Sequence, residues 1–236
     1  MLAASVCHLA APASADVSTL TPSRDNTLFQ DADGSTSSGA GPALFAGVTS
    51  QGKARRALLR FDVSAGLPPG ARIDSVVLAL HVSNAPNAIA REFTLHRVVR
   101  DWGEGTSSSS GGTGAPATAN DATWTHAFHP ADPWSAPGGD FAPSPSVSLL
   151  VGDVDTYIWS STQMAADVRS WISDPNSNYG WLLRGEEADV GTARRFDSRE
   201  APGSTRPILT VFYTQAASAR PISWGGIKAI YRRGAP

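Results

Sequence analysis

The segment Arg55–Ser64, RRALLRFDVS, alternates apolar and polar side chains over the length of a strand. In an extended chain, every second residue from Ala57 to Val63 is apolar and points to one face, which is the pattern of a half-buried β-strand. Similar segments recur along the chain with Gly, Pro, Ser and Asn between them: Val76–Ser83, Glu92–Val99, Ser146–Val151, Tyr179–Gly185 and Ile208–Thr214. Many short strands separated by turn residues predict an all-β, jelly-roll-like antiparallel sandwich rather than βαβ units.

The length and the charge of the chain narrow the class of protein further. Its 236 residues fit one β-sandwich domain, which we expect over residues 16–214. Only 17% of the residues are charged and the formal net charge is −2, so no strong field attracts nucleic acid or an anionic membrane. We also expect no membrane insertion, because no apolar run approaches the roughly 20 residues that span a bilayer.

One segment has the periodicity of a helix. In Thr162–Asp174, the side chains of Met164, Val168 and Trp171 share one face, Ser161 or Thr162 can cap the first turn, and Pro175 ends the segment. A single apolar stripe can bury only one face, so the helix is expected to pack over an end or an edge of the sandwich.

The two ends of the sequence differ from the middle in composition. Residues 1–15, MLAASVCHLAAPASA, carry no charge and end in a small-x-small pattern, which predicts a signal peptide cleaved before Asp16 and hence a secreted protein. A disordered Ala-rich segment is the alternative. The leader lacks a basic start, so we expect it to begin upstream of Met1, and Cys7, the only cysteine, is removed with it. Residues 215–236 show no strand alternation and are expected to form a disordered tail.

Several motifs occur in an order that resembles a known family. They are RRALLRFDVS (55–64), GARIDSVVLAL (70–80), WGEGTS (102–107), NDATW (120–124), GGDF (138–141), NYGWLLRG (178–185), RRFDSREA (194–201) and RPILTVFY (206–213). Together they are similar to the DNRLRE family, which is related to the disaggregatase repeats and overlaps the ninety-sixth family of carbohydrate-binding modules. The resemblance covers most of residues 25–213 and implies an exported jelly-roll sandwich that serves as an accessory module in polysaccharide handling. No catalytic unit and no hydrophobic sorting tail accompany it here.

Motifs for catalysis are weak or missing in the sequence. No Gly-x-Ser-x-Gly elbow occurs, and the run Gly103–Gly114 lacks the Lys-Ser/Thr ending of a phosphate loop. His126 and His129 could ligate a metal but are better explained as exposed loop residues. The pairs Glu186 with Glu187 and Asp153 with Asp155 could supply an acid and a base, but they are better explained as solvated strand ends.

A short oxygen-rich segment is a second candidate for a metal. Asp31 and Asp33 precede Gly34–Thr36, and oxygen ligands of this kind suit calcium. No Glu closes the loop as in a helix-loop-helix site, and a plain Asx turn explains the segment better. We therefore predict no required cofactor, with a structural calcium as one possibility.

The long irregular region Asp101–Pro145 is the expected binding surface, because loops held by a rigid sandwich often carry binding residues. Trp102, Trp124 and Trp134 border it as candidate stacking platforms for sugar rings, and Arg97 or Arg100 could bond hydroxyls or a carboxylate. The alternative is that these tryptophans hold the loops to the sandwich. The remaining tryptophans before the tail, Trp159, Trp171 and Trp181, are expected in the core.

Taken together, the sequence predicts a secreted, non-catalytic module that binds polysaccharide or a cell-envelope glycan and is monomeric. A structural surface, matrix or adhesion protein is the first alternative. A polysaccharide-degrading enzyme is the second, and it requires acid and base groups oriented in one cleft.

Overall fold

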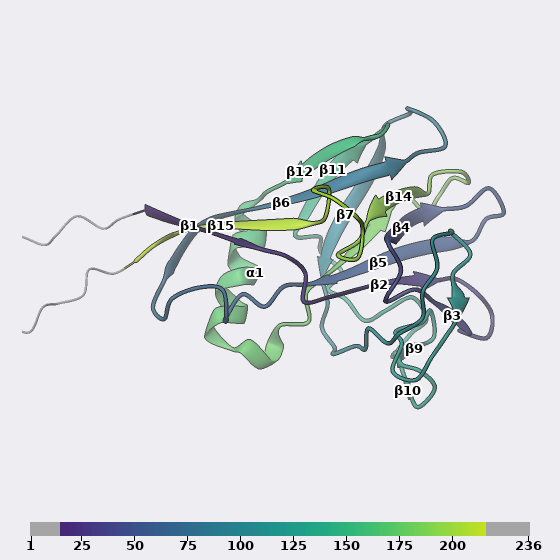
Figure 1. Cartoon of the computed structure of the whole chain (residues 1–236), viewed down its shortest axis with the longest axis horizontal. Coiled ribbons are helices and arrows are strands. Elements are labelled where there is room, and N and C mark those ends of the chain that lie inside the picture. The colour runs from purple at the N-terminus through teal and green to yellow at the C-terminus, as the bar shows by residue number, and fades with distance from the viewer. Residues whose placement is uncertain (1–14, 216–236) are drawn as a thin grey trace, which may run out of the picture.

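The computed structural model describes residues 15–215 (Figure 1). These residues form fifteen β-strands, one α-helix and one 3-10 turn. The strands are β1 (Ala15–Leu20), β2 (Arg24–Phe29), β3 (Thr36–Ser37), β4 (Ala43–Val48), β5 (Ala54–Arg60), β6 (Arg72–Asn84), β7 (Arg91–Arg97), β8 (Ala115–Pro116), β9 (His126–Phe128), β10 (Asp132–Pro133), β11 (Val147–Val151), β12 (Asp155–Trp159), β13 (Trp181–Gly185), β14 (Arg194–Asp197) and β15 (Ile208–Thr214); the helix is α1 (Thr162–Ser173) and the turn is η1 (Pro175–Ser177).

Eleven of the strands form one continuous antiparallel sheet that folds into two layers. We call the layer built on β6, with β12, β14, β15 and β1, the first sheet, and the layer β2-β5-β13-β7-β11 the second sheet. The prediction of an all-β sandwich with one helix is thereby confirmed. Within residues 15–215, no helix is long and apolar enough to cross a membrane.

The two layers are joined through β4, which changes sheet along its length. Its first half, Ala43–Ala46, pairs with β14, whereas Gly47 and Val48 pair with β5. Gly47 has a φ of +106°, which favours glycine. A Cβ on Gly47 would lie 2.8 Å from the Cα of Ala193, so the corner also excludes a side chain sterically.

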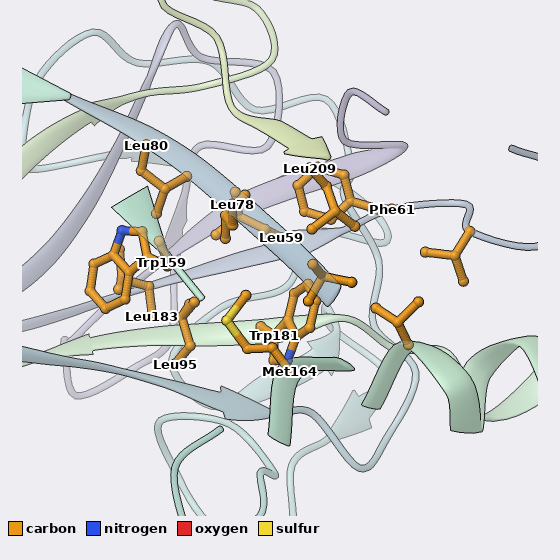
Figure 2. Packing of buried hydrophobic residues seen from close by; sticks show 14 of the residues in the cluster. Leu59, Phe61, Leu78, Leu80, Leu95, Trp159, Met164, Trp181, Leu183 and Leu209 are labelled. Carbon is orange, nitrogen blue, oxygen red and sulfur yellow. The ribbon is translucent and has the colours of Figure 1, made fainter. Parts of the chain in front are cut away.

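The main core lies between the two sheets (Figure 2). The alternating residues of β5 and the segment after it, from Ala57 to Val63, enter this core as the sequence predicts. The opposing strand β6 contributes Leu78 and Leu80. Burial of so many apolar side chains supplies the main stabilisation of a domain that, over the described residues, contains no cysteine.

The helix α1 closes one end of this core, as expected from its single apolar face. Ser161 caps it by accepting a hydrogen bond from the backbone N–H of Met164 at 2.9 Å. Trp171 packs against Trp181 with ring centroids 4.6 Å apart, and the Trp181 indole N–H donates to Asp167 at 2.9 Å. Trp159 is also fully buried, so these three tryptophans are core residues as predicted.

The predicted leader lies outside the described residues except for Ala15, and the predicted tail lies outside them except for Gln215. Ala15 pairs with Thr214, and Asp16, the expected first residue after cleavage, pairs with Tyr213.

Candidate functional site

The long region 101–145 covers part of the outer face of the second sheet, and we call it the loop layer. Trp102, Trp124 and Trp134 point into a second buried cluster with Leu58 and other apolar residues, and they are only 0%, 8% and 5% exposed. The Trp102 indole N–H donates to the carbonyl of Tyr179 at 2.8 Å, and that of Trp134 to the carbonyl of Thr123 at 2.9 Å. The expectation that these rings offer open faces to a sugar is therefore wrong for this structure, and they hold the loop layer to the sheet.

The physical reason lies in the strands beneath the loop layer. Leu28, Leu58 and Leu182 project from neighbouring strands on the outer face of the second sheet, and all are fully buried. A sheet with large apolar side chains on both faces must be covered on both. Leu58 stands on the polar side of the alternation in RRALLRFDVS, and this exception was the sequence signal for a second cover.

The two arginines predicted to contact a sugar are placed differently. Arg100 forms ion pairs with Asp132 and, at 3.7 Å, with Asp140, beside a shallow hollow of about 640 Å³ lined by Val99 and Ser135 among others. Arg97 ends β7 opposite Trp181. The structure therefore does not gather the five predicted residues into one open site, because the tryptophans are inside and the arginines lie near the surface.

The candidate calcium loop forms a local turn. The Asp31 carboxylate accepts hydrogen bonds from the backbone N–H of Ser35 at 3.1 Å and from the hydroxyl of Thr36 at 2.5 Å. Asp33 is exposed. These contacts are those of the Asx turn, and within residues 15–215 no three His, Cys, Asp or Glu side chains are arranged to hold a metal ion. A structural calcium stays a prediction.

A larger open hollow lies elsewhere, on the part of the second sheet that the loop layer leaves uncovered. This groove, of about 830 Å³, crosses the outward side chains of β7, β11 and β13 and is walled by the turn after β13. Its lining residues are mostly polar: Glu92, Thr94, His96, Pro145, Ser148, Arg184, Gly185, Glu186, Glu187 and Ala188. Apart from Glu186 and Glu187, these residues are not among the site residues predicted from the sequence, although the outward positions of those on the strands follow from the alternation of the strands.

A network of ion pairs separates the groove from the loop layer. Glu187 binds the Arg56 guanidinium through both oxygens, at 2.7 and 2.9 Å, and lies 2.9 Å from Arg184. Arg56 also stacks over the ring of Trp124 at 4.9 Å. Burial alone would raise the pKa of Glu187, but the hydrogen bonds and charges of the two arginines outweigh it and lower the pKa below its usual value. Glu187 is therefore held as an ion.

His96 forms the floor of the groove. Its Nδ1 lies 2.9 Å from the carbonyl oxygen of Ala142, which can only accept, so Nδ1 carries the proton. Its Nε2 lies 3.0 Å from the hydroxyl of Thr94 and accepts from it. Burial lowers the pKa of His96 despite the Ala142 contact, so the ring is neutral at pH 7 and serves as a fixed polar surface.

A second group of charges lies at the other side of β2, where Asp25 meets residues of the motifs WGEGTS and RRFDSREA. Nε of Arg199 lies 2.9 Å from an oxygen of Glu104 and 2.6 Å from one of Glu200. Asp25 is fully buried and accepts the backbone N–H of Arg199 at 2.7 Å, while its Oδ1 has no hydrogen-bond partner among the described residues. Burial and the neighbouring Glu200 and Glu104 raise the pKa of Asp25 well above its usual value. The contacts of Arg199 form an internal network that joins β2 to the segment after β14, whereas Asp62 lies exposed beyond the end of β5.

Comparison with known proteins adds no assignment: the chain matches no family model and none of the curated proteins.

Proposed function

We propose that this protein is a secreted, non-catalytic module that binds a polysaccharide in the groove over β7, β11 and β13. The observation that carries the proposal is the groove itself, because it is open, has a volume of about 830 Å³ and is lined by hydrogen-bonding side chains on a sheet. The resemblance to the DNRLRE family, which rests on the motifs in the sequence, supports the same class of ligand.

The chemistry of the groove suits binding to hydroxyl groups. Thr94, Ser148 and Glu92 point outward from adjacent strands at directly paired or neighbouring positions, so they form a ladder of donors and acceptors. Leu150 stands opposite Glu92 and is 65% exposed, which gives an apolar contact for the face of a sugar ring. Hydrogen bonding, rather than aromatic stacking, would then dominate recognition.

The state of the titratable groups argues for binding without catalysis. A glycosidase needs one carboxyl group that carries a proton at working pH and one that does not. Glu187 is held ionised by two arginines, and Glu186 pairs with Arg91 at 3.2 Å. Both carboxylates are therefore better suited to stabilise the walls of the groove than to transfer a proton.

The test is a glycan array with the full chain, followed by affinity measurements with any glycan retained. Ser148→Trp places an indole in the groove from an exposed strand position, and we expect it to weaken binding at least tenfold. Ser75→Trp is the matched control, because Ser75 is an exposed serine on a strand of the other outer face. Equal affinities of the two variants would show that the glycan binds outside the groove. An array with no retained glycan would contradict the proposed function.

A further inference from the structure

A smaller cavity at the corner of the sandwich has an unusual balance of charge. It has a volume of about 250 Å³ and lies where β4 passes from the first sheet to the second. No carboxylate lines it, whereas three arginines do. Its lining residues are Phe45, Val48, Thr49, Ser50, Arg55, Asn84, Pro86, Gly112, Gly191, Ala193, Arg194 and Arg195.

Arg55 is the most informative of these arginines. It is 6% exposed, its guanidinium lies 5.0 Å from the ring centre of Phe29, and it donates to the carbonyls of Gly112 and Ala54, each at 2.8 Å. These bonds use two of the five donor hydrogens of a guanidinium. Among residues 15–215, no carboxylate lies within 4.0 Å of it, and its pKa is lowered by burial although Asp31 opposes this at longer range.

The neighbouring residue, Arg56, shows how a carboxylate can neutralise a largely buried arginine in this protein. Arg56, next in the chain and on the opposite side of β5, is neutralised by the bidentate contact with Glu187. Buried charges are normally paired, because desolvation of an unpaired ion is costly. Arg55, like the fully buried Arg194, is therefore a buried cation that bonds to carbonyl groups and has no carboxylate within 4.0 Å among the described residues.

The other two arginines add positive charge to the same cavity. Arg195 pairs in register with Phe45 and with Asn84, so these three side chains share one side of the first sheet. Arg195 bonds the hydroxyl of Ser83 and lies 3.4 Å from Asp197. Arg194 is fully buried, and it donates to the backbone carbonyls of Gly152 at 2.7 Å and Ile89 at 2.8 Å.

We propose that this corner cavity binds an oxyanion, a carboxylate or a sulfate group, carried by a ligand with a ring-sized apolar body. The free donors of Arg55 and the charge of Arg195 face the anion, and planar guanidinium donors suit both groups. Phe45, Val48 and Pro86 supply apolar walls, while Thr49, Ser50 and Asn84 supply further polar contacts. The site is separate from the groove over β7, β11 and β13 and does not depend on the function proposed for it.

The test is a titration of the full chain followed by amide NMR at constant ionic strength, with sodium sulfate, sodium benzoate and sodium chloride as the probes. We expect saturable shifts around β4, β5 and β14 with sulfate or benzoate and none with chloride. A stronger effect of benzoate assigns the site to ring carboxylates, and a stronger effect of sulfate assigns it to sulfate esters. Shifts of equal size with all three salts, or no saturation, would overturn the proposal.

Two variants make the assignment specific. Arg55→Gln removes the unpaired cation and should weaken the retained anion at least tenfold, while Arg72→Gln, at an exposed arginine paired with Asp74 on β6, should leave it unchanged. Ser50→Trp fills the cavity from an exposed position and tests the site even where Arg55→Gln fails to fold. Undiminished binding in Ser50→Trp would contradict the proposal. Ser148→Trp should leave anion binding unchanged, which separates this test from that of the groove.

Discussion

The two outer faces of the sandwich are built in opposite ways. The outer face of the second sheet carries Leu28, Leu58 and Leu182 and is covered by the loop layer. The outer face of the first sheet has no comparable cover in the described structure. Away from the charged residues Arg72, Asp74 and Arg195, its outward residues are mostly small or β-branched: Val17, Ser75, Val77, Ala79, Ile158, Ile208, Thr210 and Phe212. The comparison shows that the main structural role of region 101–145 is to bury the outer face of the second sheet. The surface of this sheet that is open to a ligand is the part that region 101–145 does not cover.

Of the substitutions considered, removing a tryptophan from the loop layer should lower the free energy of unfolding most. Trp102→Ala leaves a cavity in a fully buried cluster and should lower the free energy of unfolding by about 4 kcal/mol. Phe212→Ala, at a 38% exposed ring on the uncovered face, should cost about 1 kcal/mol. Urea denaturation of the two variants measures this difference. Equal losses would mean that the loop layer adds no more stability than an exposed sheet residue.

Neutralising Glu187, the carboxylate between the groove and the loop layer, should lower the free energy of unfolding by an intermediate amount. Glu187→Gln weakens charge-assisted bonds to Arg56 and Arg184 and should cost about 2 kcal/mol at pH 7. Because the pKa of Glu187 is lowered in the folded state, its contribution is present above the usual value of 4.5 and is lost as the pH falls through the folded pKa. The stability of variant and wild type, followed by thermal unfolding from pH 7 to pH 3, should therefore converge in acid. A constant difference would show that the ion pairs are not its cause.

Asp25, on the inner side of the same sheet, should respond to pH in the opposite sense. Its raised pKa favours the protonated form in the folded state, so its contribution to stability is present in acid and is lost as the pH rises through the folded pKa. Asp25→Asn should therefore stabilise the protein by about 1 kcal/mol at pH 8 and have little effect at pH 4. Asp62→Asn, at an exposed carboxylate, is the control. Destabilisation by Asp25→Asn at pH 8 would show that Asp25 acts as a paired ion.

The alternation of apolar residues was sufficient to predict the strands of the main core and the face of α1, because each of these elements buries one face. It could not predict the corner at Gly47 or the cavity beside it, since both depend on pairing between strands far apart in the sequence. The tryptophans of region 101–145 were misplaced because a loop rich in Gly and Pro is typical of an exposed surface. Only the apolar residues on the second face of β5 and β13 reveal that this loop lies over a sheet.

The position of β6 has a consequence for how the chain can fold. The strands that pair with its two edges, β12, β14 and β15, all follow it in the sequence, and β1 pairs with β15 alone. The pair β2 and β5 can form from local chain, whereas the first sheet needs residues up to Thr214. Such non-local pairing slows folding. During synthesis, β6 therefore stays a long unpaired strand until β12 has been made, and until then its two free edges are open to association with other copies.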